Sequence, residues 1–232
     1  MSKFYVVGTP IGNMEDITFR AVRILGEVDL VLCEDTRVTK NLLNKYGINT
    51  PTFSYPSDNL KPGADNTNPK VEKILKMIEE GKTLALVSDA GTPTISDPGS
   101  VLVAKIKETQ KDIEIIAIPG PSAVISALSI SGLNVAEFIF LGFLPHKKGR
   151  ETLFKEIAES ERVMVFYESP HRIMKTLSSL IKFAPGKRVI IARELTKVFE
   201  QVISGTPVEI EKYFTDNKDK VRGEFVVIVS GI

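Results

Sequence analysis

The apolar positions in the first half of the chain follow two patterns that alternate along it. Short continuous apolar runs are typical of strands buried in a sheet, and they lie at residues 4–7, 28–33, 52–55, 84–87 and 114–118. Between these runs, apolar residues recur every three or four positions, as at Val71, Ile74 and Ile78, which predicts amphipathic helices. Strands that alternate with helices predict an α/β domain with a mostly parallel five-stranded sheet.

The second half of the chain predicts a different sheet. Apolar runs at 138–143, 162–167 and 188–192 again alternate with helices, whereas the runs at 199–204 and 224–230 flank one helix and are expected to pair antiparallel. Between the halves, the stretch Ile118-Pro119-Gly120-Pro121 can continue neither a helix nor a strand. We therefore predict an N-terminal α/β domain at 1–118 and a C-terminal α/β domain with a mixed sheet at 119–232.

Composition limits the function classes. The chain has 232 residues and a formal net charge of +1, so any contact with nucleic acid must come from a local basic cluster. A single cysteine, Cys33, and two histidines argue against a disulfide and against a metal site. The first residues do not resemble a signal peptide, and no segment approaches eighteen consecutive apolar residues. These features predict a cytoplasmic protein without a membrane anchor.

The stretch from residue 84 to residue 99 carries the most specific chemistry. A buried strand ends at Ser88, and the loop after it holds two glycines, two prolines and two aspartates. Ligands of open α/β sheets bind beyond the carboxyl ends of the strands. Asp89 and Asp97 come without a Lys or Arg, so the loop does not suit a phosphate; it suits a ribose diol, an ammonium or a sulfonium. The alternative is that Asp89 caps a turn and Asp97 opens the next helix.

Other strand ends also carry polar or glycine-rich segments. The first strand runs into Gly8-Thr9-Pro10-Ile11-Gly12, whose spacing is not the GxGxxG fingerprint, which disfavours a nicotinamide enzyme. The second strand runs into Glu34-Asp35-Thr36-Arg37, a segment that either meets a substrate or only caps the next helix. Residues 56–70 are polar and rich in Pro and Asn, and predict a long loop of the kind that often forms a lid.

The densest basic cluster follows the first strand of the second half. Lys147, Lys148 and Arg150 are candidates for contact with the phosphate backbone of RNA, although most basic runs are only solvated. His171 stands alone at a helix start, where a capping or packing role is the commoner one.

Six motifs, in order along the chain, resemble the ribosomal RNA methyltransferases of the tetrapyrrole methylase superfamily. They are Gly-Thr-Pro-Ile-Gly-Asn at 8–13, Glu-Asp-Thr-Arg at 34–37, Ser-Asp-Ala-Gly-Thr-Pro-Thr-Ile-Ser-Asp-Pro-Gly at 88–99, Pro-Gly-Pro-Ser-Ala at 119–123, Phe-Tyr-Glu-Ser-Pro-His-Arg at 166–172 and Ala-Arg-Glu-Leu-Thr-Lys at 192–197. The resemblance covers essentially the whole chain. It departs at Thr94, where the family pattern has an apolar residue or Gly, and in the loop at 56–70.

The resemblance implies two α/β domains with S-adenosylmethionine bound between them, and a homodimer. It also implies 2′-O-methylation of a cytidine ribose in 16S ribosomal RNA, in the decoding centre of the small ribosomal subunit. Carried over residue by residue, the cofactor site of the family falls on Pro10, Asp89, Thr92, Ser122, Ala123, Tyr167 and the segment from Ala192 to Leu195.

Methyl transfer to a ribose hydroxyl requires positioning of the reactants, and a nearby base should help to remove the proton. Several groups at predicted strand ends are candidates, and the sequence does not choose among them: Glu34, Asp35, Glu168, Glu194 and Lys197. We expect Glu34 with Arg37, and Arg193 with Glu194, to orient the nucleotide, and no metal is required. Two other functions stay open: a precorrin-type tetrapyrrole methyltransferase, which shares the cofactor, and a non-catalytic ribosome-binding module.

Overall fold

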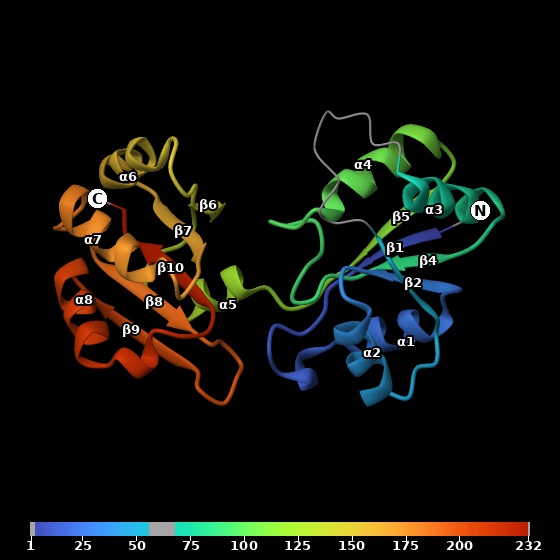
Figure 1. The fold of residues 1–232 in the computed structure, drawn as a ribbon, viewed down its shortest axis with the longest axis horizontal. Helices are drawn as coiled ribbons and strands as arrows, with labels where there is room; N and C mark the ends of the chain where they lie inside the picture. Colours follow the sequence, from blue (N-terminus) through green and yellow to red (C-terminus); the bar gives the residue numbers. More distant parts are fainter. Residues whose placement is uncertain (1–2, 56–67, 232) are drawn as a thin grey trace. The chain divides into compact units, whose positions relative to one another are not determined.

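The computed structural model describes residues 3–55 and 68–231 and is drawn in Figure 1. The chain divides into two compact units, Met1–Ser122 (unit 1) and Ala123–Ile232 (unit 2). The division thus falls a few residues later than the sequence predicted, since 119–122 group with unit 1. A physical reason is visible at Gly120, whose backbone packs directly against that of Gly8 in the same unit.

Unit 1 is built on one parallel sheet with the strand order β3-β2-β4-β1-β5. Its strands are β1 (Lys3–Val7), β2 (Leu30–Cys33), β3 (Thr52–Ser54), β4 (Leu84–Leu86) and β5 (Glu114–Ile118). All four strand pairings are parallel, which confirms the predicted five-stranded parallel sheet. The central strand β4 is completely buried, as expected for an apolar run without polar alternation.

Helices cover both faces of this sheet (Figure 1). On one face, α1 (Phe19–Glu27) and α2 (Thr36–Lys45) form a core with strand residues such as Ala85; on the other face, α3 (Pro69–Glu79) and α4 (Gly99–Thr109) pack around Leu84 and Leu86. Successive side chains of β4 therefore pack into the cores on opposite faces of the sheet, because side chains alternate across a strand. The short 3₁₀ helix η1 (Met14–Asp16) precedes α1.

Most of the predicted loop at 56–70 lies outside the described residues. Its last residues belong to α3, which Asn68 caps by accepting a hydrogen bond from the backbone N–H of Lys70, with Pro69 in the first turn.

Unit 2 starts with α5 (Ala123–Ser129) and contains a mixed sheet with the order β6-β7-β10-β8-β9. Its strands are β6 (Phe138–Phe143), β7 (Val163–Glu168), β8 (Val189–Arg193), β9 (Gln201–Gly205) and β10 (Phe225–Val229). Strands β6 and β7 are parallel, while β10 runs antiparallel to β7 and to β8, and β9 runs antiparallel to β8. The predicted mixed sheet is confirmed. The last two strands, β9 and β10, do not pair with each other. Each pairs antiparallel with β8, which lies between them.

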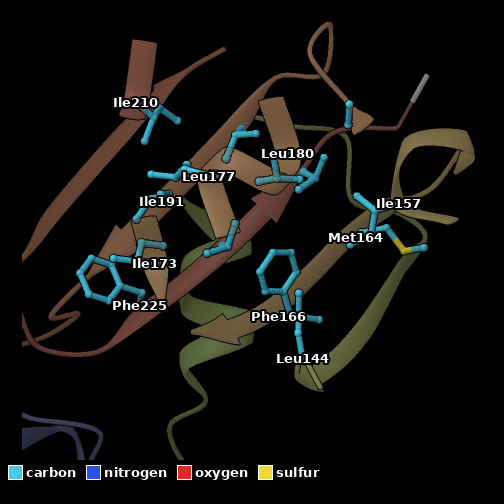
Figure 2. Close-up of a cluster of buried hydrophobic side chains, with 14 of the residues drawn as sticks. Leu144, Ile157, Met164, Phe166, Ile173, Leu177, Leu180, Ile191, Ile210 and Phe225 are labelled. Atoms are coloured by element: carbon cyan, nitrogen blue, oxygen red, sulfur yellow. The ribbon is translucent and has the colours of Figure 1, made fainter. Parts of the chain in front are cut away.

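The core of unit 2 lies between this sheet and the helices α6 (Arg150–Glu159), α7 (Ile173–Phe183) and α8 (Pro207–Asp216). Figure 2 shows the interdigitating side chains, with Leu144 next to Phe166 and with Leu177 and Leu180 of α7 over the strands. A capping box fixes the start of α8, because Thr206 and Glu209 satisfy each other's backbone N–H groups. The 3₁₀ helix η3 (Lys218–Lys220) leads into β10.

Within the two described ranges, no helix has both the length and the apolar character that crossing a membrane requires.

Candidate functional site

The parallel register of unit 1 brings the carboxyl ends of its strands to one edge of the sheet. The segments that leave these ends are called the strand-end loops: 8–13 after β1, 34–37 after β2, 87–98 after β4 and 119–122 after β5. They contain every site residue that the sequence predicted in unit 1.

The loops after β1 and β4 are tied together through their backbones. The N–H of Thr9 donates to the carbonyl oxygen of Gly91 at 2.9 Å, and the N–H of Gly91 donates back to Thr9 at 3.2 Å. The buried hydroxyl of Thr9 also lies 3.1 Å from the carbonyl oxygen of Ser88. These contacts give the aspartate-bearing loop a fixed course across the end of β1, next to the predicted cofactor residue Pro10, whose side chain is buried.

The loops after β1 and β5 touch backbone to backbone. A Cβ atom at Gly8 would lie 2.8 Å from the Cα of Gly120, and a Cβ at Gly120 would lie 2.8 Å from the Cα of Gly8. Only glycine fits at both positions, since no flexible side chain can give way. Thr92 adds a further link between the loops by donating from its hydroxyl to the carbonyl oxygen of Pro121 at 3.3 Å. Ser122 and Ala123 follow directly, at the start of α5.

The two aspartates nearest the sheet edge differ in environment. Arg37 donates to both carboxylate oxygens of Asp35, and these hydrogen bonds, with one from the Arg37 backbone, lower the pKa of Asp35 to about 2. Asp35 also caps α2, as the alternative for this segment predicted. Asp89 accepts one hydrogen bond on Oδ1, from the backbone N–H of Asp35 at 3.2 Å. Burial, followed by the charges of Asp35 and Asp97, raises the pKa of Asp89. Its Oδ2 has no hydrogen-bond partner among the described residues.

Asp97 has a structural role within its loop. Its Oδ1 accepts hydrogen bonds from the backbone N–H groups of Gly99 at 2.6 Å and Thr94 at 3.3 Å, so it helps to open α4, as the alternative reading of this residue predicted. Thr94 and Ser96 both have positive φ angles, 73° and 56°. Such angles are costly for a β-branched residue, which explains why glycine suits position 94.

In unit 2, the predicted cofactor residues lie on neighbouring parts of the sheet. Tyr167, half-buried near the end of β7, packs its ring edge-on against Phe140 with the centroids 5.0 Å apart. Burial raises the pKa of Tyr167, and a hydrogen bond with the backbone of Val124 opposes this effect. The tyrosine therefore lies beside the start of α5, where Ala123 is found. Ala192 and Leu195 are both buried.

Arg193 and Glu194 are held by their own unit. Arg193 is buried and donates to the backbone carbonyls of Arg222 at 2.8 Å and Phe199 at 3.1 Å. Glu194 accepts hydrogen bonds from Lys197 at 3.0 Å and from the backbone N–H of Glu224 at 2.9 Å. Burial would raise the pKa of Glu194, but these hydrogen bonds and the charge of Lys197 outweigh it and lower the pKa. The Arg193 guanidinium thus joins two loops of unit 2, and its predicted part in orienting a nucleotide stays a prediction.

The basic cluster also differs from its prediction. Lys147 and Lys148 are exposed on the loop at 144–149, called the basic loop, and neither forms an ion pair with a residue that the structure describes. Arg150, in contrast, is only 7% exposed. Its guanidinium turns inward to the Thr176 hydroxyl at 2.7 Å and lies 3.9 Å from Glu168. The structure therefore separates the Arg150 side chain from the two exposed lysines of the predicted cluster.

Glu168 anchors a buried charged network that the sequence did not predict. Its carboxylate is fully buried and forms an ion pair with Arg172 at 2.7 Å, while Oε2 accepts a hydrogen bond from Thr176 at 2.6 Å. This environment removes Glu168 from the candidate bases. The sequence held only part of the signal: Arg172 and Thr176 are four residues apart at the start of α7, whereas Glu168 is the last residue of β7, which helical spacing does not place.

The donor set of unit 1 fits S-adenosylmethionine. Asp89 offers an exposed carboxylate oxygen to a ribose diol or an ammonium, and glycines let a ligand approach the backbone closely. The loops at 8–13, 87–98 and 119–122 contain no Lys or Arg, and the Arg37 side chain is paired with Asp35. In the described ranges, no three His, Cys, Asp or Glu side chains are grouped so that they could hold a metal ion.

Comparison with known proteins assigns the chain to a family. The family model for tetrapyrrole (corrin/porphyrin) methylases matches residues 3–211. The chain belongs to this family. The membership confirms the predicted superfamily and the predicted enzyme class, a methyltransferase.

Its sequence relatives are named ribosomal RNA small subunit methyltransferase I. The chain is 45% identical to the one from Thermotoga maritima, with 100% of this chain and 99% of the relative covered. It is 44% identical to the one from Synechocystis, with 100% and 80% covered, and 44% identical to the one from Vibrio cholerae, with 98% and 76% covered.

Solved structures of the tetrapyrrole methylase family share the fold. A cobalt precorrin-4 methyltransferase of cobalamin biosynthesis matches with a TM-score of 0.69 and 17% identity, covering 98% of this chain and 94% of that one. A uroporphyrin-III C-methyltransferase from Thermus thermophilus matches with a TM-score of 0.64 and 16% identity, covering 99% and 94%. At these identities the likeness bears on the fold alone.

Proposed function

We propose that this methyltransferase transfers a methyl group from S-adenosylmethionine to the 2′-oxygen of a cytidine ribose in 16S ribosomal RNA, in the decoding centre of the small subunit. The observation that carries the proposal is the 45% identity to a relative named ribosomal RNA small subunit methyltransferase I over the full length of both chains. The tetrapyrrole enzymes share only 16–17% identity with this chain, so they lend no support to a porphyrinoid substrate.

S-adenosylmethionine, when bound, supplies a methyl group on a positively charged sulfur. In unit 1, the Oδ2 of Asp89 is available to accept a hydrogen bond from the ribose or the ammonium of the cofactor. Pro10, Thr92, Ser122 and Ala123 lie on the same set of loops or directly after it and remain the predicted neighbours of Asp89. In unit 2, the predicted cofactor contacts are Tyr167, Ala192 and Leu195; the last two are buried side chains whose backbone would make the contact.

Removal of the ribose proton requires a base whose pKa is not strongly lowered. Asp35 is paired with Arg37, Glu168 is fully buried in an ion pair, and Glu194 has a lowered pKa. Ion pairs with Glu224 and Glu194 outweigh burial and raise the pKa of Lys197, which therefore stays protonated. We assign the base role to Glu34, a half-buried carboxylate in the loop after β2, whose neighbour Asp35 is hydrogen-bonded through its backbone to Asp89.

The RNA contact is assigned to Lys147 and Lys148, because they are the exposed, unpaired cations of the predicted cluster. Their small number and the net charge of +1 favour a shaped target, the assembled small subunit, over free RNA. A cytoplasmic location and a homodimeric state complete the proposal.

The test is to incubate the purified protein with small ribosomal subunits and labelled S-adenosylmethionine, digest the RNA and identify the labelled nucleoside. The expected product is 2′-O-methylcytidine at one position. Label on a base, or label only in an added porphyrinoid, would overturn the substrate assignment. Binding of subunits without any methyl transfer would indicate a non-catalytic module.

A further inference from the structure

The basic loop is anchored at both ends and exposed between them. Leu144, its first residue, is buried in the core of unit 2 beside Phe166 (Figure 2). Arg150, the residue after the loop, is also buried, whereas 145–149 are all exposed. Such a loop can be placed accurately only if its own backbone is held.

Two arginines hold that backbone: Arg150, which is buried, and Arg172, whose side chain is 14% exposed. The NH1 group of Arg172 donates to the carbonyl oxygen of Leu144 at 2.7 Å, and the NH1 group of Arg150 donates to the carbonyl oxygen of Pro145 at 3.3 Å. The backbone N–H of Arg150 also donates to the carbonyl oxygen of Lys147 at 3.2 Å. Arginine side chains therefore fix the two residues at the start of the basic loop, and the backbone of Arg150 fixes Lys147 itself.

The arginines are in turn fixed by Glu168 and Thr176. Glu168 accepts from Arg172 on one oxygen at 2.7 Å and from the Thr176 hydroxyl on the other at 2.6 Å. The same hydroxyl accepts from Arg150 at 2.7 Å. Among the described residues, neither Thr176 nor Glu168 forms a hydrogen bond or an ion pair with the basic loop, so any effect that they have on it passes through the arginines.

Stability alone does not explain this network. A buried ion pair is often no more stabilising than well-packed apolar residues of the same volume. Here two cations share one buried carboxylate, and Arg150 keeps its buried Nε without a hydrogen-bond partner among the described residues. Apolar side chains would fill the space as well, but they could not hold the carbonyl oxygens of Leu144 and Pro145.

We infer that Arg150 and Arg172, held by Glu168 and Thr176, are positioning residues that place Lys147 and Lys148 against RNA phosphates. The inference rests on the proposed function, since it needs the basic loop to contact RNA. Its consequence is specific: loosening the network should weaken RNA binding only through the two lysines.

The experiment is a double-mutant cycle that measures binding of the full chain to small ribosomal subunits at several salt concentrations. Arg172→Lys keeps the charge beside Glu168 but shortens and removes the guanidinium fork that reaches Leu144. The Lys147→Ala/Lys148→Ala variant is expected to bind about tenfold more weakly at low salt. Arg172→Lys should weaken binding about fivefold in the parent, and should have no further effect in the lysine-free background.

Three further variants guard against a general loss of structure. Thr176→Val removes the central hydroxyl and should behave as Arg172→Lys does, whereas Thr176→Ser keeps the hydroxyl and should restore parental binding. Phe214→Leu destabilises the core of unit 2 at a residue outside the network and should leave subunit binding unchanged. Thermal unfolding and S-adenosylmethionine affinity are measured for every variant.

The outcomes separate the inference from the proposed function. Equal weakening by Arg172→Lys in both backgrounds, or no weakening in the parent, would overturn the inference while subunit methylation continues. Parental binding by the lysine variant would also overturn it, because the loop would then not contact RNA. Failure of the proposed function has a different signature, since the parent itself would not methylate the subunit RNA.

Discussion

Replacing Gly8 by alanine tests whether the backbone contact between the loops after β1 and β5 shapes the cofactor site. The new Cβ would lie 2.8 Å from the Cα and 2.9 Å from the N of Gly120. Ordinary van der Waals contact begins at 3.4 Å, so the two loops must separate by about 0.6 Å, the difference between 3.4 and 2.8 Å. Both opposing atoms belong to the backbone and cannot rotate away.

The expected cost follows from this displacement. Overpacking a close contact typically costs about 1–3 kcal/mol, which corresponds to a melting temperature lower by about 2–12 °C for a chain of this size. A misplacement of about 1 Å can lower catalytic efficiency about a hundredfold, so a shift of half that size is expected to reduce kcat/KM about tenfold. The affinity for S-adenosylmethionine should fall as well.

Gly26→Ala is the matched control. Gly26 lies exposed in α1, and a Cβ there would meet nothing within 4 Å. Alanine should therefore stabilise the helix by about 0.5–1 kcal/mol and leave cofactor affinity unchanged. Calorimetry of unfolding and of cofactor binding on both variants decides the matter: a Gly8→Ala protein with parental stability and affinity would refute the close approach as a determinant of the site.

Four further predictions concern Asp89, Glu34, the two lysines of the basic loop and the form of the RNA substrate. Because the pKa of Asp89 is raised, its protonated carboxyl group favours folding at pH values below the ordinary aspartate pKa, and this contribution is lost as pH rises through the raised pKa. Asp89→Asn should therefore not lower the melting temperature at pH 7, yet it should weaken S-adenosylmethionine binding about ten- to a hundredfold, since a charged hydrogen bond is worth roughly 1.5–3 kcal/mol; unchanged calorimetric affinity would remove the assignment. Glu34→Gln should lower kcat with cofactor affinity retained, and an unchanged kcat would exclude Glu34 as the base. Lys147→Ala/Lys148→Ala should reduce the slope of log affinity against log salt by about one to two, with a parental slope indicating a merely solvated loop. Methylation should be rapid on intact small subunits and slow on a short RNA hairpin, and equal rates on the two would contradict a shaped target.

The local pattern of apolar and polar residues was sufficient to predict most of the strands and both types of sheet. The apolar runs at 84–87 and 188–192 match the buried strands β4 and β8 to within one residue at each end, because a buried strand needs a continuous apolar segment. The six motifs, taken together in order, were also sufficient to predict the family. They cover loops along the whole chain, which makes the combination far more specific than any single motif.

Tertiary structure alone decided what individual charged residues do. Lys148 and Arg150 are two positions apart in one basic stretch, yet one is exposed and the other turns inward to Thr176, 26 residues further along the chain. In the sequence, Glu168 and Glu34 are equal candidates for the base. Only the folded chain places Arg150 and Arg172 beside Glu168. The contact between Gly8 and Gly120 is a further example. The residues that surround each glycine in the sequence do not indicate that its backbone packs against that of the other. Propensity and periodicity report interactions within a few residues, whereas burial, pairing and pKa depend on groups that only the folded chain brings together.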